Sequence, residues 1–131
     1  MILCFGELLV DFLNFNQIQA NKTALNEFRQ YPGGAPANVA AALAKLGANT
    51  RFLGQVGDDQ FGRFLIQALN QHNVDTSFLY THPTAPTPLA FVFLDEHKER
   101  TFEFYRNNTA DVVFSEDQLV DEAFAGAEIF H

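Results

Sequence analysis

The sequence GGAPAN at residues 33–38 decides the fold, because it joins a strand-like run to the clearest helix in the chain. Its paired glycines allow positive φ angles and let a ligand approach the backbone with no Cβ in the way. Pro36 suits the first turn of a helix, and residues 37–46 are rich in alanine and leucine, the best helix formers. Gly47 follows as a C-cap. The stretch predicts a strand, a glycine turn and a helix, in that order.

The same stretch has the chemistry of a binding site. The amino terminus of the predicted helix presents free N–H groups next to the glycines. Asn38, one turn into the helix, offers both a donor and an acceptor to a hydroxyl group. Such a site suits a neutral polyol. Taken alone, these residues fit equally well a simple Gly-Gly turn with Asn38 on the solvent side.

Strands and helices alternate on both sides of this stretch. Residues 2–5 are a short apolar run that predicts a first buried strand, and residues 50–56 predict a second. Residues 61–71 carry an apolar helical stripe, which Asp58 and Asp59 precede as N-capping residues rather than as a metal-binding pair. This order with short links favours an α/β fold with a parallel sheet flanked by helices.

Strand-like runs dominate the chain after residue 74. Residues 78–80, 89–94 and 101–105 are three such runs, and the last two predict a hairpin. Because side chains alternate between the two faces of a strand, we expect this hairpin to carry a row of aromatic rings on one face, here called the four-ring wall. A ligand or another chain would have to cover these rings. The expected wall consists of Phe91, Phe93, Phe102 and Phe104.

The last part of the chain predicts one more helix and one more strand. Ser115 and Gln118 fit a capping box that opens a helix running to about Ala125. Residues 127–131 then begin what reads as another buried strand, where the sequence ends. Domains usually end on a polar, exposed segment, so we expect this chain to be part of a longer protein.

Composition narrows the classes of function. The formal net charge of −8 repels polyphosphate backbones, so nucleic-acid binding through a basic surface is not expected. The single cysteine, Cys4, excludes an internal disulfide, and the four scattered histidines have no i, i+4 pair, so no metal site is predicted. No apolar stretch approaches the ~20 residues of a membrane span, and no signal peptide is recognisable at the amino terminus. We therefore expect a cytoplasmic protein with no membrane contact.

Residues 33–57 resemble the first sequence signature of the ribokinase-like (PfkB-type) sugar kinases. The paired glycines, Asn38, Ala40, Gly47 and Gly57 stand at the spacing of that signature. Residues 4–7 with Asp11 resemble the opening strand of the family, residues 57–62 resemble its next turn, and residues 87–92 and 102–106 resemble its lid strands. The sequence GGAPAN at residues 33–38 and the sequence FYR at residues 104–106 resemble the fructokinase-like branch more than ribokinase itself.

The resemblance implies that the chain is the N-terminal half of a kinase, with an α/β body and a small β-sheet lid. The lid strands would lie at about residues 9–15, 27–31, 89–94 and 101–106, and the sugar would lie between body and lid. Sugar hydroxyls would be bound by Asp11, Gly33, Gly34 and Asn38, rings of the lid would cover the apolar face of the sugar, and a cation would donate to the substrate. The rings are Phe91 and Phe104, and the cation is Arg106.

Each of these assignments has an alternative. Asp11 could cap a turn, Arg106 could be a solvated charge at the end of a strand, and the rings could pack against the lid of a second copy in a homodimer.

The resemblance also shows what these residues lack. The second family signature, whose Asp acts as catalytic base, belongs to the C-terminal half, as do the anion hole and the ATP-binding surface. We therefore expect ATP and Mg²⁺ to serve the full-length enzyme but not to bind this segment, and no catalytic residue is predicted within residues 1–131. The chain alone should be inactive.

Three functions remain open at this stage. The first is ATP-dependent phosphorylation of a hydroxyl of a small sugar, fructose before others, with this segment supplying the sugar-binding half. The second is a kinase of a nucleoside or a ketogluconate, and the third is a non-catalytic sugar-binding or dimerising fragment. The nature of Phe91, Phe104 and Arg106 discriminates between substrates, because a base needs stacking whereas an acid sugar needs the cation.

Overall fold

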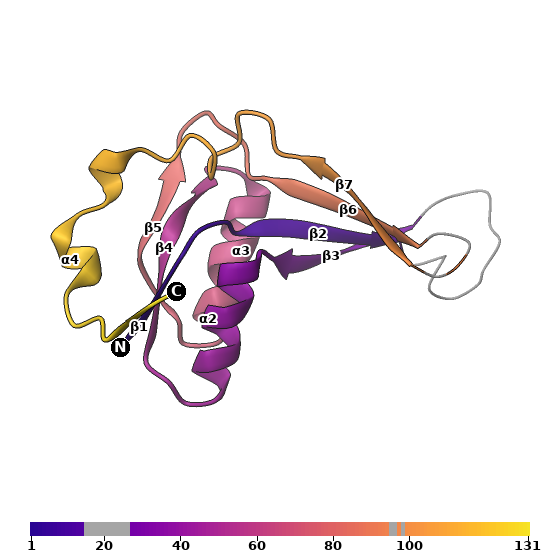
Figure 1. The fold of residues 1–131 in the computed structure, drawn as a ribbon. Coiled ribbons are helices and arrows are strands. Elements are labelled where there is room, and N and C mark those ends of the chain that lie inside the picture. The colour runs from indigo at the N-terminus through magenta and orange to yellow at the C-terminus, as the bar shows by residue number, and fades with distance from the viewer. Residues whose placement is uncertain (15–26, 95–96, 98) are drawn as a thin grey trace.

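The computed structural model describes residues 1–14, 27–94, 97 and 99–131 (Figure 1). The loop predicted at residues 17–25 lies outside this part of the chain. The elements occur in the following order: β1 (Ile2–Phe5), β2 (Leu9–Asn14), β3 (Phe28–Gly33), α2 (Ala35–Lys45), β4 (Thr50–Gly57), α3 (Gln60–Asn70), β5 (Asp75–His82), β6 (Leu89–Leu94), β7 (Arg100–Tyr105), the 3₁₀ helix η1 (Glu116–Gln118), α4 (Asp121–Phe124) and β8 (Ile129–Phe130).

The first sheet, here called the body sheet, has the strand order β5-β4-β1-β8, and each neighbouring pair is parallel. The predicted run at residues 78–80 belongs to this sheet, as part of β5. Both predicted helices form, with α2 beginning at Ala35 and α3 at Gln60. The parallel α/β fold expected from the alternation of elements is confirmed.

Alternate residues of β1 serve cores on the two faces of the body sheet. Cys4 packs in one cluster with Phe52 and Leu65, on the side of α2 and α3. Leu3 packs in a second cluster with Ala123, on the side of α4. Figure 1 shows the same three layers, with α2 and α3 on one side of the sheet and α4 on the other. Because both faces are covered at its centre, the inner strand β1 (ILCF) is apolar throughout, as buried parallel strands are.

The second sheet has the strand order β3-β2-β6-β7 and extends away from the body (Figure 1). Strand β2 pairs antiparallel with β3 and parallel with β6, and β6 pairs antiparallel with β7. These are the four runs predicted for the small sheet, with β3 continuing as far as Gly33. The sheet joins the body where β1 leads into β2, so the residues between these strands lie at the carboxyl edge of the body sheet.

The predicted four-ring wall on one face of the β6–β7 hairpin does not form. Phe91 pairs with Glu103, and Val92 pairs with Phe102. Directly paired residues of an antiparallel ladder share a face, so Phe102 lies on the face opposite to Phe91. The ring of Phe91 instead contacts that of Tyr105, at 5.5 Å between centroids. Alternation within each strand is as expected, but the register between the strands differs by one residue.

The helix predicted to run from the capping box to about Ala125 is also wrong. The capping box forms, with Gln118 Oε1 accepting from the Ser115 N–H at 2.8 Å, but η1 ends at Gln118 and α4 starts only at Asp121. The Gln118 carbonyl accepts from the Tyr80 hydroxyl at 3.3 Å, and Arg51 donates to the carbonyl of Ala123 at 3.0 Å. Hydrogen bonds from the body sheet thus take the place of helical ones.

Asp59 ties the start of α3 to the entry of the second sheet. Its Oδ1 accepts from the Gly62 N–H at 2.8 Å, which confirms the predicted N-cap. The same carboxylate accepts from the Thr87 N–H at 2.8 Å and from the Thr87 hydroxyl at 2.7 Å. Burial raises the pKa of Asp59, but the hydrogen bonds from Thr87 and Gly62 outweigh it and hold this pKa below its ordinary value.

Asp59→Ala is expected to lower the free energy of unfolding by about 2–4 kcal/mol, since it removes an N-cap and two further hydrogen bonds to a carboxylate. Because the pKa of Asp59 is lowered in the folded state, its contribution is present above the ordinary Asp value near ~3.9 and is lost as the pH falls below it. Urea unfolding at pH 7 and at pH 3 measures both effects. The control is Asp58→Ala, whose partly exposed ion pair with Arg63 should contribute less than about 1 kcal/mol. Equal losses for the two variants would contradict the assignment.

Candidate active site

The glycine turn lies against the connection between β1 and β2. Gly34 has φ 103°, a conformation that favours glycine, and a Cβ there would overlap the backbone carbonyl of Glu7. A Cβ on Gly33 would overlap the carboxylate of Asp11. A glycine is therefore required at position 34, where the neighbour is backbone, and the approach at Gly33 brings the turn and the side chain of Asp11 together.

Asp11 lies near the middle of the second sheet. It pairs with Tyr31 of β3 and with Ala90 of β6, and its side chain is half-buried. Burial raises the pKa of Asp11, and the charge of Arg100 partly offsets the rise. Among the described residues, no donor reaches the Asp11 carboxylate. Its oxygens therefore have capacity to accept hydrogen bonds from a ligand.

Asn38 lies in the first turns of α2, where its N–H donates to the Gly34 carbonyl at 2.9 Å. It is exposed and borders, together with Gly33 and Leu8, a cavity of about 240 Å³. The first N–H of α2, that of Ala35, donates to Glu7 Oε1 at 3.3 Å. The amino terminus of the helix is thus directed at a carboxylate of the chain itself.

The two predicted rings lie on opposite faces of the second sheet. Phe104 pairs with Ala90, the partner of Asp11, so Phe104 shares the Asp11 face, where it is 57% exposed. Phe91 stacks on Phe12 at 5.1 Å between centroids. Successive residues of a strand point to opposite faces, so Phe12 and Phe91 face away from Asp11. The expectation that Phe91 faces the same site as Asp11 is wrong.

Arg106 follows β7 and reaches the carboxyl edge of the body sheet. Its Nε donates to Asp111 Oδ2 at 2.5 Å, and its Nη2 lies 3.9 Å from Glu7 Oε2. The guanidinium borders a cavity of about 130 Å³ that is also lined by Gly6 and Gln55, at the ends of β1 and β4. In open α/β sheets, ligands bind at this edge.

Sequence reasoning did not assign a role to Glu7 or Asp111. Glu7 gave a signal, since a carboxylate directly after a strand and a glycine stands at the carboxyl edge of a parallel sheet. Asp111 gave none, because nothing in its local sequence indicates that Arg106 would fold back onto it.

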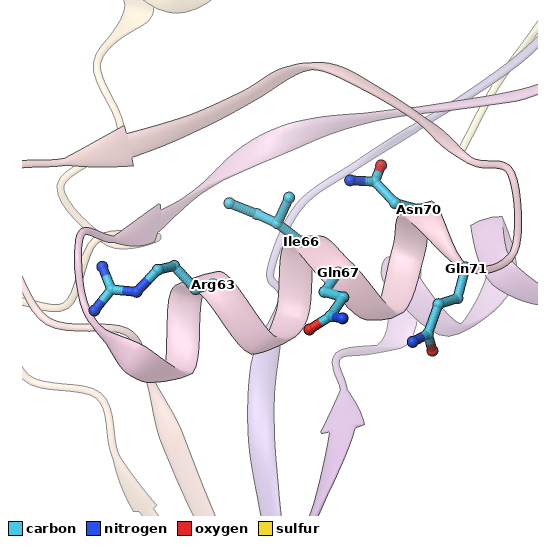
Figure 2. Close-up of a pocket in the computed structure, with 5 residues that line it drawn as sticks. All are labelled: Arg63, Ile66, Gln67, Asn70 and Gln71. Carbon is cyan, nitrogen blue, oxygen red and sulfur yellow. The ribbon is translucent and has the colours of Figure 1, made fainter.

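A cavity of about 450 Å³ runs along α3 and is lined by Arg63, Ile66, Gln67, Asn70 and Gln71 (Figure 2). None of the predicted site residues borders it. Among the described residues, no three His, Cys, Asp or Glu side chains gather as a metal site would require. None of the helices described is both long and apolar enough to cross a membrane.

A parallel body sheet whose carboxyl edge adjoins a small second sheet, with a glycine turn and a carboxylate at the junction, defines the class of ribokinase-like carbohydrate kinases. The chain belongs to the pfkB family of carbohydrate kinases, whose sequence pattern matches residues 1–131. The family resemblance of the sequence is thereby confirmed, and the family is one of phosphotransferases.

The similar proteins include plant and bacterial fructokinases. A probable chloroplastic fructokinase-6 of Arabidopsis thaliana is 42% identical over 130 residues, which cover 99% of this chain and 34% of that relative. The fructokinase of Xylella fastidiosa with bound ATP is 44% identical with a TM-score of 0.89, over 99% of this chain and 40% of that one. The fructokinase of Vibrio cholerae O395, with fructose, ADP and a calcium ion, is 37% identical with a TM-score of 0.76, over 89% of this chain and 35% of that one. The chain thus spans between a third and two fifths of the length of these relatives.

Proposed function

We propose that this chain is the sugar-binding part of an ATP-dependent fructokinase-like enzyme, which phosphorylates a hydroxyl of a small sugar. The observation that carries the proposal is the carboxylate of Asp11, which touches Gly33 of the glycine turn and has no donor from the described residues. An ionised carboxylate accepts hydrogen bonds from two hydroxyls at once, as a polyol offers. The similarity to fructokinases over nearly the whole chain supports the same function.

In this proposal, each of the other site residues has a distinct task. Gly33 and Gly34 hold the turn against Asp11 and Glu7 and present its backbone groups to a sugar hydroxyl. Asn38 exchanges hydrogen bonds with a hydroxyl, and Phe104 covers an apolar face of the ring. Arg106 donates to a sugar oxygen from the edge of the body sheet. Phe91 supports the sheet from its other face rather than touching the sugar.

Charge around Arg106 favours a neutral sugar over a ketogluconate. An acid sugar needs a cation that is not already neutralised, whereas Arg106 is bonded to Asp111 and lies near Glu7. The local sum of these three side chains is one negative charge, which repels a second carboxylate. Fructose, the ligand named for the Vibrio cholerae structure, fits this environment.

ATP and a divalent cation are needed for the proposed reaction. The sequence contains no G-x-x-x-x-G-K-[ST] loop, and the amino terminus of α2 is directed at Glu7. We propose that the nucleotide and its metal ion bind to a part of the kinase beyond these residues.

We also propose a homodimer through the Asp11 face of the second sheet. Tyr31, Phe102 and Phe104 are 45%, 52% and 57% exposed in the single chain. Phe102 and Phe104 stack at 5.9 Å between centroids on β7, and Tyr31 lies on β3 at the other edge of the same face. Exposed rings gathered on one face of a sheet mark an interaction surface. A cytoplasmic location stays a prediction, and the Arabidopsis relative is a chloroplastic protein by name.

The function is tested with the catalytically complete kinase that contains residues 1–131. We expect it to release ADP in a fructose-dependent manner, with kcat/KM for fructose above that for a nucleoside or for ketogluconate. The 131-residue chain, assayed alone, is expected to give no ATP-dependent phosphorylation. A complete kinase that prefers a nucleoside would contradict the proposal of a sugar substrate. Turnover by the 131-residue chain alone would contradict the proposal that the ATP-binding groups lie beyond it.

A further inference from the structure

Asp111 is a buried carboxylate with two hydrogen bonds. Its side chain is 3% exposed. Oδ2 accepts from Arg106 Nε at 2.5 Å, and Oδ1 accepts from the Thr109 hydroxyl at 2.6 Å. A buried carboxylate is costly unless it is paired and hydrogen-bonded. Removing Arg106 from this position would leave Asp111 without its charge partner, so the pair resists separation.

The segment that carries Asp111 is fastened to the body sheet. The Ala110 N–H donates to the Pro86 carbonyl at 2.9 Å, and Gln55 Nε2 donates to the Ala110 carbonyl at 2.7 Å. Gln118 Nε2 in turn donates to Gln55 Oε1 at 2.5 Å. Asp111 is therefore held from β4, a strand that belongs to the body and not to the second sheet.

Glu7 links the same guanidinium to the glycine turn. Its Oε1 accepts from the first N–H of α2, that of Ala35, and its Oε2 lies 3.9 Å from Arg106 Nη2. One carboxylate thus connects the loop that carries Gly34 with the cation that follows β7. Since Nε is bonded to Asp111 and Nη2 faces Glu7, the plane of the guanidinium has little freedom to rotate.

We propose that Asp111 and Glu7 are positioning residues for Arg106: they hold its guanidinium at the carboxyl edge of the body sheet, so that its remaining N–H groups donate to an oxygen of the bound sugar. This inference rests on the proposed function, because it needs a sugar in the site. If Asp111 positions Arg106, the contribution of Arg106 to sugar affinity depends on the presence of Asp111. A purely structural ion pair would not produce this dependence.

Kinetics of the complete kinase test this dependence. We expect Arg106→Ala and Asp111→Asn each to raise the sugar KM by about tenfold, a loss of roughly one charge-assisted hydrogen bond, with little change in the KM for ATP. The double variant should be no worse than Arg106→Ala alone, because coupled residues are not additive. Glu7→Gln should give a smaller rise in the same direction. Asp58→Asn, which changes a distant exposed pair with Arg63, is the matched control.

A second measurement needs no catalysis. In the complete kinase, the Arg106 Nε–H is expected to give an NMR signal protected from exchange with water, retained in Asp58→Asn and lost in Asp111→Asn. Absence of protection in the unaltered kinase would overturn the positioning. If the Nε–H is protected but Arg106→Ala and Asp111→Asn both leave the sugar KM unchanged, the ion pair between these residues is only structural. That result would also overturn the proposal. Failure of the proposed function gives a different result, because the unaltered complete kinase would then phosphorylate no sugar. That result would remove the role of Arg106 as well.

Discussion

Asp11→Ala in the complete kinase is expected to raise the KM for the sugar by about one to three orders of magnitude, with little effect on the KM for ATP. The size follows from the loss of one or two hydrogen bonds to an ionised carboxylate, at roughly 1.5–3 kcal/mol each. Asp11 suits this role because it is half-buried against Gly33, so a ligand that displaces water there meets a strong acceptor. Steady-state kinetics at saturating ATP measures the change.

In the proposed site, the same carboxylate is expected to make sugar binding depend on pH. Hydroxyl groups donate to the ionised form, and burial raises the pKa of Asp11, with Arg100 partly offsetting it. The sugar KM should therefore rise as the pH falls, starting above the range of an ordinary Asp. Asp11→Asn should remove this dependence while it keeps the shape of the side chain. A sugar KM unchanged by Asp11→Ala would return Asp11 to a structural role.

Much of this site is predictable because its signals are local. Paired glycines before a helix indicate a close approach whatever lies opposite, and both Gly33 and Gly34 have such an approach in the structure. The spacing of apolar residues identifies the strands and helices. Asp59 is predicted as an N-cap because it stands directly before an apolar helical stripe. The resemblance to the family adds Asp11, whose role no period or spacing indicates.

The features that sequence reasoning missed depend on partners far along the chain. Whether Phe91 faces Asp11 is decided by the register of β2 against β6, in which Phe91 pairs with Phe12, and alternation within each strand leaves that register open. The helix after Ser115 stops at Gln118, whose carbonyl accepts from the hydroxyl of Tyr80, 38 residues away. Glu7 lies 3.9 Å from the guanidinium of Arg106, a residue that follows a strand of the other sheet. Tertiary contacts decide each of these.

The largest loss of stability is expected at the glycine turn. Gly34→Ala should lower the free energy of unfolding by about 3 kcal/mol or more, because two costs combine. An alanine at φ 103° is strained by about 1–3 kcal/mol, and its Cβ overlaps the backbone carbonyl of Glu7, which has no flexible side chain to give way. Relief of the overlap must move the β1–β2 connection, so the distance between Asp11 and the turn changes as well.

Gly47→Ala is the matched control, because Gly47 has φ 89° but nothing within 4 Å of the position of a Cβ. It carries the strain of the backbone without the overlap, and it lies at the far end of α2 from the site. Urea unfolding of both variants separates the two costs: the excess loss in Gly34→Ala measures the contact with Glu7. Equal losses would show that the turn yields without cost and that Gly34 is needed for its φ alone. In the complete kinase, only Gly34→Ala should also raise the sugar KM, since only that substitution moves the backbone against which Asp11 and the sugar are held.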